Sequence, residues 1–251
     1  MASRHTEVRR PKKVRFRDLI LHEDDRVVVI NKPAGIASLS DREDGENLLF
    51  LARKYDPALK LCHRLDKYTT GVLLFAKTPE VYRAIAIAFE EREVHKHYLA
   101  VIEGIATFEE EVVDLPIEIA GKGKARIANG GGKPSLTVFS TAEMFRDYTL
   151  LNCHPMTGRM HQIRVHLSAI GLPIVGDGAY GGKDVFLSEI KRNFRPNRKE
   201  MESPIHDQYL LHARGIMLVL PGDEEESTFI APLPKKFEAA LRILRKYNPA
   251  D

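Results

Sequence analysis

The chain of 251 residues has few cysteines and no long hydrophobic run. Its two cysteines, Cys62 and Cys153, cannot form a disulfide framework, although a single bridge between them is compatible with the sequence. Such sparse cysteine usage favours a reducing compartment, the cytoplasm. No run of about 18 apolar residues is present, and the first residues lack the apolar stretch of a secretory signal. We therefore expect a cytoplasmic protein without a membrane partner.

The usual motifs of cofactor and metal sites are also missing. Residues 176–181 fit the pattern GxGxxG, but no helical pattern follows them and no strand–helix–strand unit surrounds them, so we expect a loop there. The phosphate-loop spacing and the G-x-S-x-G elbow are absent. The histidines show no H-E-x-x-H spacing, and the cysteines lie far apart. The sequence therefore predicts neither a metal site nor a bound cofactor.

Positive charge is concentrated at the N-terminus. The net charge is only +3, yet the segment from Arg4 to Arg17 carries seven Lys or Arg residues and one Glu. This pattern predicts a flexible basic arm over residues 1–15 that contacts phosphate groups; a merely solubilising tail is the alternative. The remaining residues, 16–251, have the 43% hydrophobic content of a globular protein and are long enough for one substantial domain.

Short apolar and β-branched runs alternate with turn residues along this domain. They predict strands at residues 26–31, 71–77, 96–104, 136–142, 148–154 and 210–220. Helical spacing predicts helices at residues 46–54, 79–92, 161–170 and 234–247, and the polar segment 182–208 suggests an inserted loop or short helix outside the core. Because turns rather than regular crossover helices separate the strands, we expect an α+β fold with a mostly antiparallel sheet flanked by helices.

The densest chemistry lies at residues 63–66. His63, Arg64, Leu65 and Asp66 form a turn just before the apolar run that begins at Gly71. Loops supported by a rigid sheet are where reacting groups usually lie. A structural Arg–Asp pair that stabilises the turn explains this segment equally well when it is taken alone.

A second cluster spans residues 158–166. It contains Arg159, His161, Arg164 and His166. If it begins a helix, Arg164 shares a face with His161, and the first turn offers N–H groups and a positive dipole end that suit phosphate. The alternative is a cationic surface helix, which does not need two arginines and two histidines within eight residues.

Taken in order, these segments resemble the motifs of the RluA-type RNA pseudouridine synthases. The similar segments are residues 31–35 (NKPAG), 63–66 (HRLD) with 71–74 (GVLL), 96–100 (KHYLA), 158–166 (GRMHQIRVH), 211–213 (LHA) and 231–234 (APLP). Lys67 and Tyr68 depart from the residues that the family often has, and Thr70 replaces a common serine. Only about two dozen residues precede the first strand, so the resemblance is to members without an N-terminal RNA-binding module.

The resemblance implies a pseudouridine-synthase fold, with residues 16–251 as the catalytic domain, and an enzyme that isomerises uridine in structured RNA without a cofactor. Asp66 would be the nucleophile or base, and Arg164 would pair with it to keep it ionised and placed. Tyr98 would stack on the flipped base and act as an acid or base. Arg64 would fill the space that the base vacates, and Leu211 would pack beneath the uracil. We expect the other substrate contacts from three neighbours in the same motifs: His63, Arg159 and His161.

Further expectations concern the substrate, the oligomeric state and two alternative functions. We favour 23S-type ribosomal RNA over tRNA as the substrate, and a monomer. An RNA glycosylase is a second reading, but it would normally use a second placed carboxylate, and none is evident near these motifs. A non-catalytic RNA-binding protein on the same fold is a third reading, which the intact Asp66 disfavours.

Overall fold

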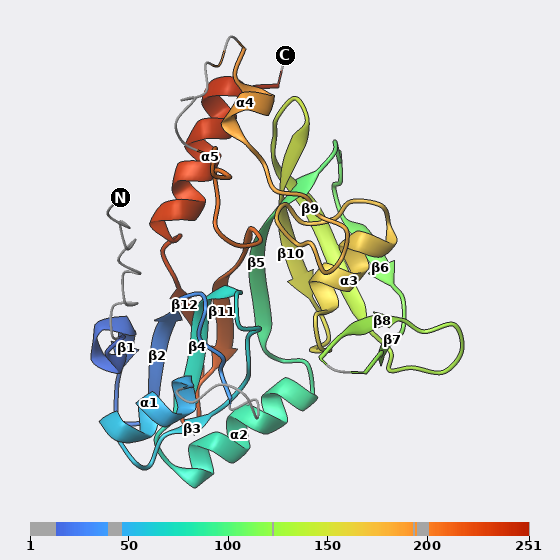
Figure 1. Ribbon diagram of the computed structural model, residues 1–251. Coiled ribbons are helices and arrows are strands. Elements are labelled where there is room, and N and C mark those ends of the chain that lie inside the picture. Colours follow the sequence, from blue (N-terminus) through green and yellow to red (C-terminus); the bar gives the residue numbers. More distant parts are fainter. Residues whose placement is uncertain (1–13, 40–46, 122, 193, 195–200, 251) are drawn as a thin grey trace, which may run out of the picture.

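The computed structural model describes residues 14–39, 47–121, 123–192, 194 and 201–250 (Figure 1). Its main sheet has ten strands, ordered β1-β2-β4-β11-β5-β10-β9-β6, with β3 beside β4 and β12 beside β11. The strands are β1 (Ile20–Glu23), β2 (Val27–Lys32), β3 (Lys60–Leu61), β4 (Thr70–Ala76), β5 (His95–Glu103), β6 (Glu111–Asp114), β9 (Leu136–Met144), β10 (Tyr148–Pro155), β11 (Leu211–Val219) and β12 (Glu226–Ile230). A separate hairpin consists of β7 (Ile117–Ile119) and β8 (Ala125–Ile127).

Helices flank this sheet. They are η1 (Phe16–Leu19), α1 (Leu48–Tyr55), α2 (Pro79–Glu90), α3 (Gln162–Ala169), α4 (Leu187–Ile190) and α5 (Lys235–Tyr247). All strand pairs of the described sheet are antiparallel except β4 with β11. The expected α+β fold with a mostly antiparallel sheet is confirmed.

Strand β4 lies in the middle of the core. Every one of its residues is buried, as the continuous apolar run predicted. Val72 and Leu74 pack in the cluster that includes α2, whereas Leu73 and Phe75 pack in the cluster that includes α1. Successive side chains of a strand point to opposite faces, so β4 is covered on both sides. Farther along the sheet, α3 packs with β5, β9 and β10 in a third cluster, and α5 covers other residues of β5 and β10 in a fourth.

Two helix boundaries follow from local sequence. Thr78 accepts a hydrogen bond from the Val81 N–H at 3.3 Å, and Pro79 follows as the first helical residue of α2. Gly171, with φ of +78°, follows the end of α3. Both boundaries were predicted.

Several features differ from the sequence-based expectation. The strands β1, β3, β6, β7, β8 and β12 were not predicted. The expectation that residues 182–208 lie outside the core was wrong, because Val185 and Ile190 are 2% and 3% exposed and pack in the α5 cluster; α4 is the short helix that was expected there. Cys62 and Cys153 are both free thiols.

The expected basic arm lies almost entirely outside the described residues. Within them, the buried Phe16 is the first side chain that packs in the core. None of the described helices is both long enough and apolar enough to cross a membrane.

Candidate active site

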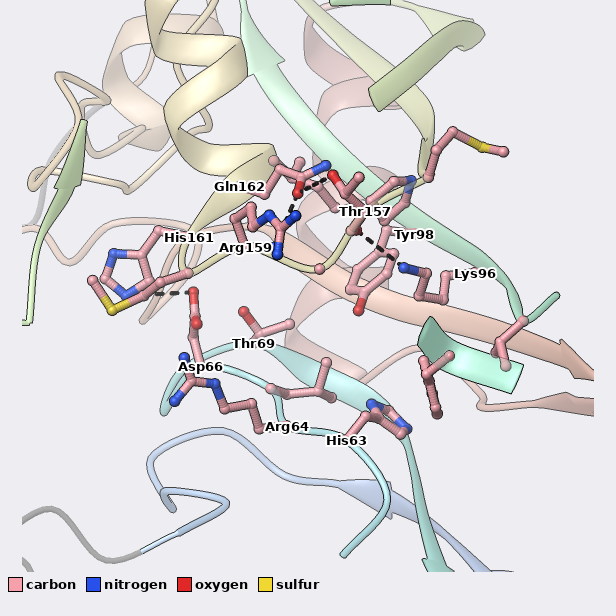
Figure 2. Close-up of a pocket in the computed structure, with 18 of the residues that line it drawn as sticks. His63, Arg64, Asp66, Thr69, Lys96, Tyr98, Thr157, Arg159, His161 and Gln162 are labelled. Atoms are coloured by element: carbon pink, nitrogen blue, oxygen red, sulfur yellow. Dashed lines mark hydrogen bonds and ion pairs between the residues drawn. The ribbon is translucent and has the colours of Figure 1, made fainter. Parts of the chain in front are cut away.

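A cavity of about 590 Å³ brings together all eight predicted site residues. This volume is typical of small-ligand pockets. The residues come from the loop before β4, from β5, from the loop before α3, from α3 itself and from β11: His63, Arg64, Asp66, Tyr98, Arg159, His161, Arg164 and Leu211. Figure 2 shows Asp66 and Arg64 facing His161 and Arg159 across this cavity. Segments that are far apart in the sequence therefore form one site.

The loop that carries Asp66 is anchored from beneath by Lys32. This lysine is fully buried in β2, and its Nζ donates to the carbonyl oxygens of Pro33, Lys67 and Thr69 at 3.0, 2.9 and 2.8 Å. Burial lowers the pKa of Lys32 to about 7, and nearby Asp66 opposes that shift. With three acceptors for its three ammonium protons, Lys32 ties the chain just after Asp66 to the end of β2.

Arg164 of α3 joins Asp66 to a second carboxylate. Its Nη1 donates to Oδ2 of Asp66 at 3.1 Å, while Nε and Nη2 donate to the two oxygens of Asp177 at 2.7 and 2.8 Å. The side chain of Asp177 is 1% exposed and that of Arg164 is 7% exposed, whereas that of Asp66 is 25% exposed toward the cavity. Burial opposes the charged guanidinium, but the bonds to Asp177, together with Tyr209 and Asp66, raise the pKa of Arg164 above its usual value. Arg164 is therefore a fixed cation that orients Asp66.

Two tyrosine rings hold the guanidinium in place. The Arg164 Cζ lies 4.7 Å from the ring centroid of Tyr180 and 4.4 Å from that of Tyr209. Both rings are within the range of a cation–π contact. The Tyr209 hydroxyl in turn shares a hydrogen bond of 3.1 Å with Thr69, three residues after Asp66. Tyr209 thus supports both Arg164 and the loop that carries Asp66.

His161 lies on the other side of Asp66. Its Nε2 is 3.7 Å from Asp66 Oδ2, and its Nδ1 is 2.7 Å from the hydroxyl of Tyr180. Burial lowers the pKa of His161, and Asp66 opposes that shift. His161 lies just before α3 rather than on a face of the helix as expected, yet both His161 and Arg164 approach Asp66.

Tyr98 of β5 lines the cavity close to Asp66. Burial raises the pKa of Tyr98, and the negative charge of Asp66 raises it further. The phenol is therefore protonated at neutral pH, so that it can donate a hydrogen bond but is a poor base. Its ring also packs against the two clusters that contain α1 and α3, which fixes the ring between the two parts of the core.

The other predicted residues differ in their burial and in the hydrogen bonds that they form within the protein. His63 accepts a hydrogen bond from the Leu74 N–H at 3.2 Å, and burial lowers the pKa of His63 to about 3, so its ring is a neutral acceptor tied to β4. Arg159 donates through Nε to the Pro134 carbonyl at 3.1 Å. Leu211 is 4% exposed at the base of the cavity.

Sequence reasoning missed the residues that hold Arg164 and the loop before α3. Asp177 and Tyr180 belong to the glycine-rich segment that was correctly predicted to be a loop but was given no further role. The structure does place a second carboxylate near the motifs, but both Asp177 oxygens bind Arg164, so it does not supply the placed, solvent-facing acid of a glycosidase pair. Gln162 was also missed; it accepts from the Thr157 hydroxyl and the Arg159 N–H at 2.7 and 3.0 Å and so fixes that loop.

A metal centre would need several ligands close together. Within the described ranges, no three His, Cys, Asp or Glu side chains cluster as metal ligands would.

Comparison with known proteins shows similarity over most of the chain. Residues 26–169 match the family of RNA pseudouridylate synthases. The ribosomal large subunit pseudouridine synthase C of Vibrio parahaemolyticus is 34% identical over 239 residues, which cover 92% of this chain and 70% of the relative. The ribosomal large subunit pseudouridine synthase D of Xanthomonas campestris is 32% identical over 243 residues, with 90% and 69% coverage. The structure of human RNA pseudouridylate synthase domain containing 4 superposes with a TM-score of 0.67 at 27% identity, covering 92% of this chain and 94% of that one.

Proposed function

Because the chain belongs to the RNA pseudouridylate synthase family and is an RNA pseudouridine synthase, we propose that Asp66 carries the isomerisation as nucleophile or base, without a cofactor. The observation that supports this most is the position of Asp66: a partly exposed carboxylate at the cavity, held at one oxygen by the buried Arg164. The reaction exchanges bonds within a single substrate and leaves its oxidation state unchanged, so the chemistry requires no redox partner.

The reaction needs a carboxylate beside the sugar. The bond from the anomeric carbon to N1 breaks, the uracil turns over, and the same carbon joins C5. C5 then gives up its proton, and N1 gains one, so the overall composition is unchanged. Asp66 either attacks the anomeric carbon or removes the neighbouring sugar proton to give a glycal; in both routes the carboxylate acts at the ribose. Among the described residues, both polar contacts to the Asp66 carboxylate fall on Oδ2, so Oδ1 is the oxygen that is available to the sugar.

The uridine must leave the RNA stack before it can reach Asp66, at a cost of a few kcal/mol. In our proposal, the Tyr98 ring stacks on the flipped uracil, Leu211 packs beneath it, and the exposed Arg64 fills the place that the base leaves. Arg159 and His161 contact the substrate from the opposite wall of the cavity. His63 supports the wall that carries Arg64 through its bond to Leu74.

We propose ribosomal RNA of the large subunit as the substrate class, ahead of tRNA, and the cytoplasm as the compartment. The names of the similar synthases of Vibrio parahaemolyticus and Xanthomonas campestris support this choice of substrate. We also propose that the enzyme acts as a monomer, since one copy of the chain supplies all eight predicted residues of the cavity.

The test is modification of defined RNA by purified protein. Unmodified large-subunit ribosomal RNA and tRNA transcripts are incubated with the protein in chelator-treated buffer, and pseudouridines are mapped by chemical labelling and reverse transcription. We expect pseudouridine at one or a few uridines of the ribosomal RNA. Release of free uracil would instead support a glycosylase, and binding that leaves every uridine unchanged would support a non-catalytic RNA-binding protein.

A further inference from the structure

His161 has a backbone conformation that few residues adopt. It precedes α3 with φ of 55° and ψ of 22°, in the left-handed region; among the described residues, only one other non-glycine residue, Arg92, has a positive φ. Histidine enters this region more readily than most residues, but the conformation is still strained. Strain of this kind persists where the surrounding structure enforces it, often at functional sites.

The conformation places the imidazole between Asp66 and Tyr180. Its Nε2 faces Asp66 Oδ2 at 3.7 Å, a contact that Figure 2 marks with a dashed line, and its Nδ1 lies 2.7 Å from the Tyr180 hydroxyl. The Tyr180 ring meets the imidazole edge-on, with centroids 5.6 Å apart and planes at 85°. The ring of His161 therefore has a fixed orientation, with a different partner at each nitrogen.

The two partners together select one tautomer. The Tyr180 oxygen accepts the Ala125 N–H at 3.1 Å, and its single proton can go either to Nδ1 of His161 or to the Ala125 carbonyl at 3.2 Å. If the proton went to Ala125, Nδ1 would carry the imidazole proton and the lone pair of Nε2 would face a carboxylate. A proton on Nε2 replaces that repulsion by attraction, and Tyr180 then donates to Nδ1 at the shorter distance.

We propose that His161 is a positioning residue for Asp66, held by Tyr180 as the neutral Nε2–H tautomer that donates to Asp66 Oδ2 once RNA is bound. The proposal rests on the assignment of Asp66 as the reacting carboxylate. With Arg164 and His161 both directed at Oδ2, the carboxylate can turn neither way, and Oδ1 is presented to the ribose. The free-state distance of 3.7 Å is longer than a hydrogen bond, and such contacts often shorten only when substrate binds.

The surroundings of the imidazole suit a neutral donor. Asp66 and Asp177 carry negative charge near it, Arg164 and Arg64 carry positive charge, and Tyr180 provides the neutral partner. Burial lowers the pKa of His161, which keeps it uncharged near neutral pH. A second positive charge on Oδ2 would instead compete with the reaction by making Asp66 a weaker nucleophile.

Tyr180 also extends the arrangement to the β7–β8 hairpin. Its hydroxyl binds the backbone of Ala125 in β8. Tyr180 and Met160, the residue before His161, both pack against the cluster of Ile117, Ala125 and Val165. The hairpin lies outside the main sheet (Figure 1) and so serves as the support against which His161 is oriented. A Tyr180→Phe variant removes only this hydroxyl, while the ring that covers Arg164 at 4.7 Å stays in place.

The first test uses the free wild-type protein. Histidine-selective ¹⁵N labelling distinguishes the two neutral tautomers by their nitrogen shifts, and the His161 signal is identified by its absence from His161→Asn. We expect Nε2–H at neutral pH. A predominant Nδ1–H form, or an imidazolium at pH 7, would overturn the proposal. This readout needs no RNA and does not depend on the role of Asp66.

The second test measures single-turnover pseudouridine formation at saturating RNA. We expect Tyr180→Phe and His161→Asn each to slow the reaction about tenfold or more, as loss of a hydrogen bond to a charged group does. The RNA affinity of Tyr180→Phe should stay within about twofold of wild type. Asparagine tolerates the left-handed backbone at this position. The double variant should be no slower than the slower single variant, because both substitutions disrupt the same contact, that of the oriented His161 with Asp66.

A matched control is Tyr55→Phe. This substitution removes a hydroxyl that donates a hydrogen bond of 2.8 Å to Glu23, and Tyr55 does not line the cavity. Its rate should equal that of wild type. Unchanged rates in Tyr180→Phe, multiplying losses in the double variant, or losses confined to RNA affinity would each refute a positioning role. An active Asp66→Asn in the same assay would refute the assignment of Asp66 instead, so the two failures are distinguishable.

Discussion

At the scale of single residues, Arg164 lies between two carboxylates that differ in exposure. Asp177, 1% exposed, uses both oxygens on the guanidinium, and the 25% exposed Asp66 receives the remaining Nη1. Supporting partners of this kind fix a reacting group before substrate arrives. One oxygen of Asp66 is therefore already held by Arg164 in the free enzyme.

Tyr98 gives a residue-scale prediction that separates its ring from its hydroxyl. Tyr98→Ala should weaken capture of the flipped uracil by about 1–3 kcal/mol, the value of one base–aromatic stack. Tyr98→Phe keeps the stack, and since burial raises the pKa of Tyr98, it removes only a protonated donor. RNA binding and single-turnover rates of both variants provide the measurement. Wild-type activity in Tyr98→Ala would place Tyr98 outside the site.

Lys32 gives a prediction about pH and stability. Burial lowers the pKa of Lys32 to about 7, against about 10.4 in an unfolded chain. Below about pH 7 both states hold the proton, and burial of the charge destabilises the fold by a constant amount. Between about pH 7 and 10 the unfolded state binds more protons, so the free energy of unfolding rises with pH.

The variant Lys32→Met isolates this effect. At pH 7 it should be less stable than wild type by about 1–3 kcal/mol, because three carbonyls lose their donor. The difference between wild type and variant should then grow as the pH rises toward 10, as measured by urea unfolding. A difference that does not change with pH would contradict the shifted pKa of Lys32.

At the scale of secondary-structure elements, the junction of β4 with β11 requires a glycine. Gly71 has φ of +113°, and a Cβ built there would lie 2.0 Å from the Ala213 carbonyl oxygen. Only a residue without a side chain permits this parallel contact, five residues after Asp66. The junction joins the two parts of the sheet between which the cavity lies.

Substitution at Gly71 tests this requirement. Gly71→Ala should lower the melting temperature more than Gly35→Ala, because Gly35 also has a positive φ, +84°, but has no atom within 4 Å of an added Cβ. Gly35→Ala therefore measures the backbone strain alone, about 1–2 kcal/mol, and Gly71→Ala adds a backbone clash. Equal stability of the two variants by thermal unfolding would contradict the close approach.

Long periodic elements could be predicted from the sequence, and short ones could not. The apolar run of β4 and the capped start of α2 each carry a local signal. By contrast, β3 has two residues and β1 has four, with alternating partly buried and exposed positions. Such strands are specified by their neighbours in the sheet rather than by their own residues.

The candidate site likewise contains residues that could be predicted from the sequence and residues that could not. Asp66, Arg164 and His161 belong to dense local motifs, so the sequence alone singled them out. Asp177 and Tyr180 were missed because their segment was considered only as a dinucleotide motif, and their partners lie 13 or more residues away in the chain. An acidic and an aromatic residue within a glycine-rich loop could have indicated a supporting role. Glycines let the backbone of such a loop approach neighbouring elements closely, and the other side chains of the loop then reach those elements.

At the scale of the whole molecule, the sheet runs through the protein with helices on both of its faces (Figure 1). The net charge of +3 is too small to attract RNA strongly by itself. We therefore expect the basic arm predicted from the sequence to contribute to RNA affinity.

Removal of residues 1–13 tests the arm. It deletes Arg4, Arg9, Arg10, Lys12 and Lys13 and leaves the pair between Arg15 and Asp18 in place. Affinity for structured RNA should fall, and the slope of log affinity against log salt should become shallower by about 0.7–0.9 for each phosphate group that the shortened protein no longer binds. Turnover at saturating RNA should change little. Coincident salt titrations of the full-length and shortened proteins would show that the arm only aids solubility.

We propose above that the Asp66 carboxylate carries out the isomerisation while the buried Arg164 holds one of its oxygens. Asp66→Asn keeps the size of the side chain and removes its charge, and it leaves the contacts of Arg164 to Asp177 intact. The most direct measurement is single-turnover pseudouridine formation by this variant, with deamidation excluded by mass spectrometry and RNA affinity measured in parallel. We expect no detectable pseudouridine, while RNA binding stays within about tenfold of wild type, or about 1.4 kcal/mol. Substantial pseudouridine from the intact variant would show that Asp66 does not carry out the reaction.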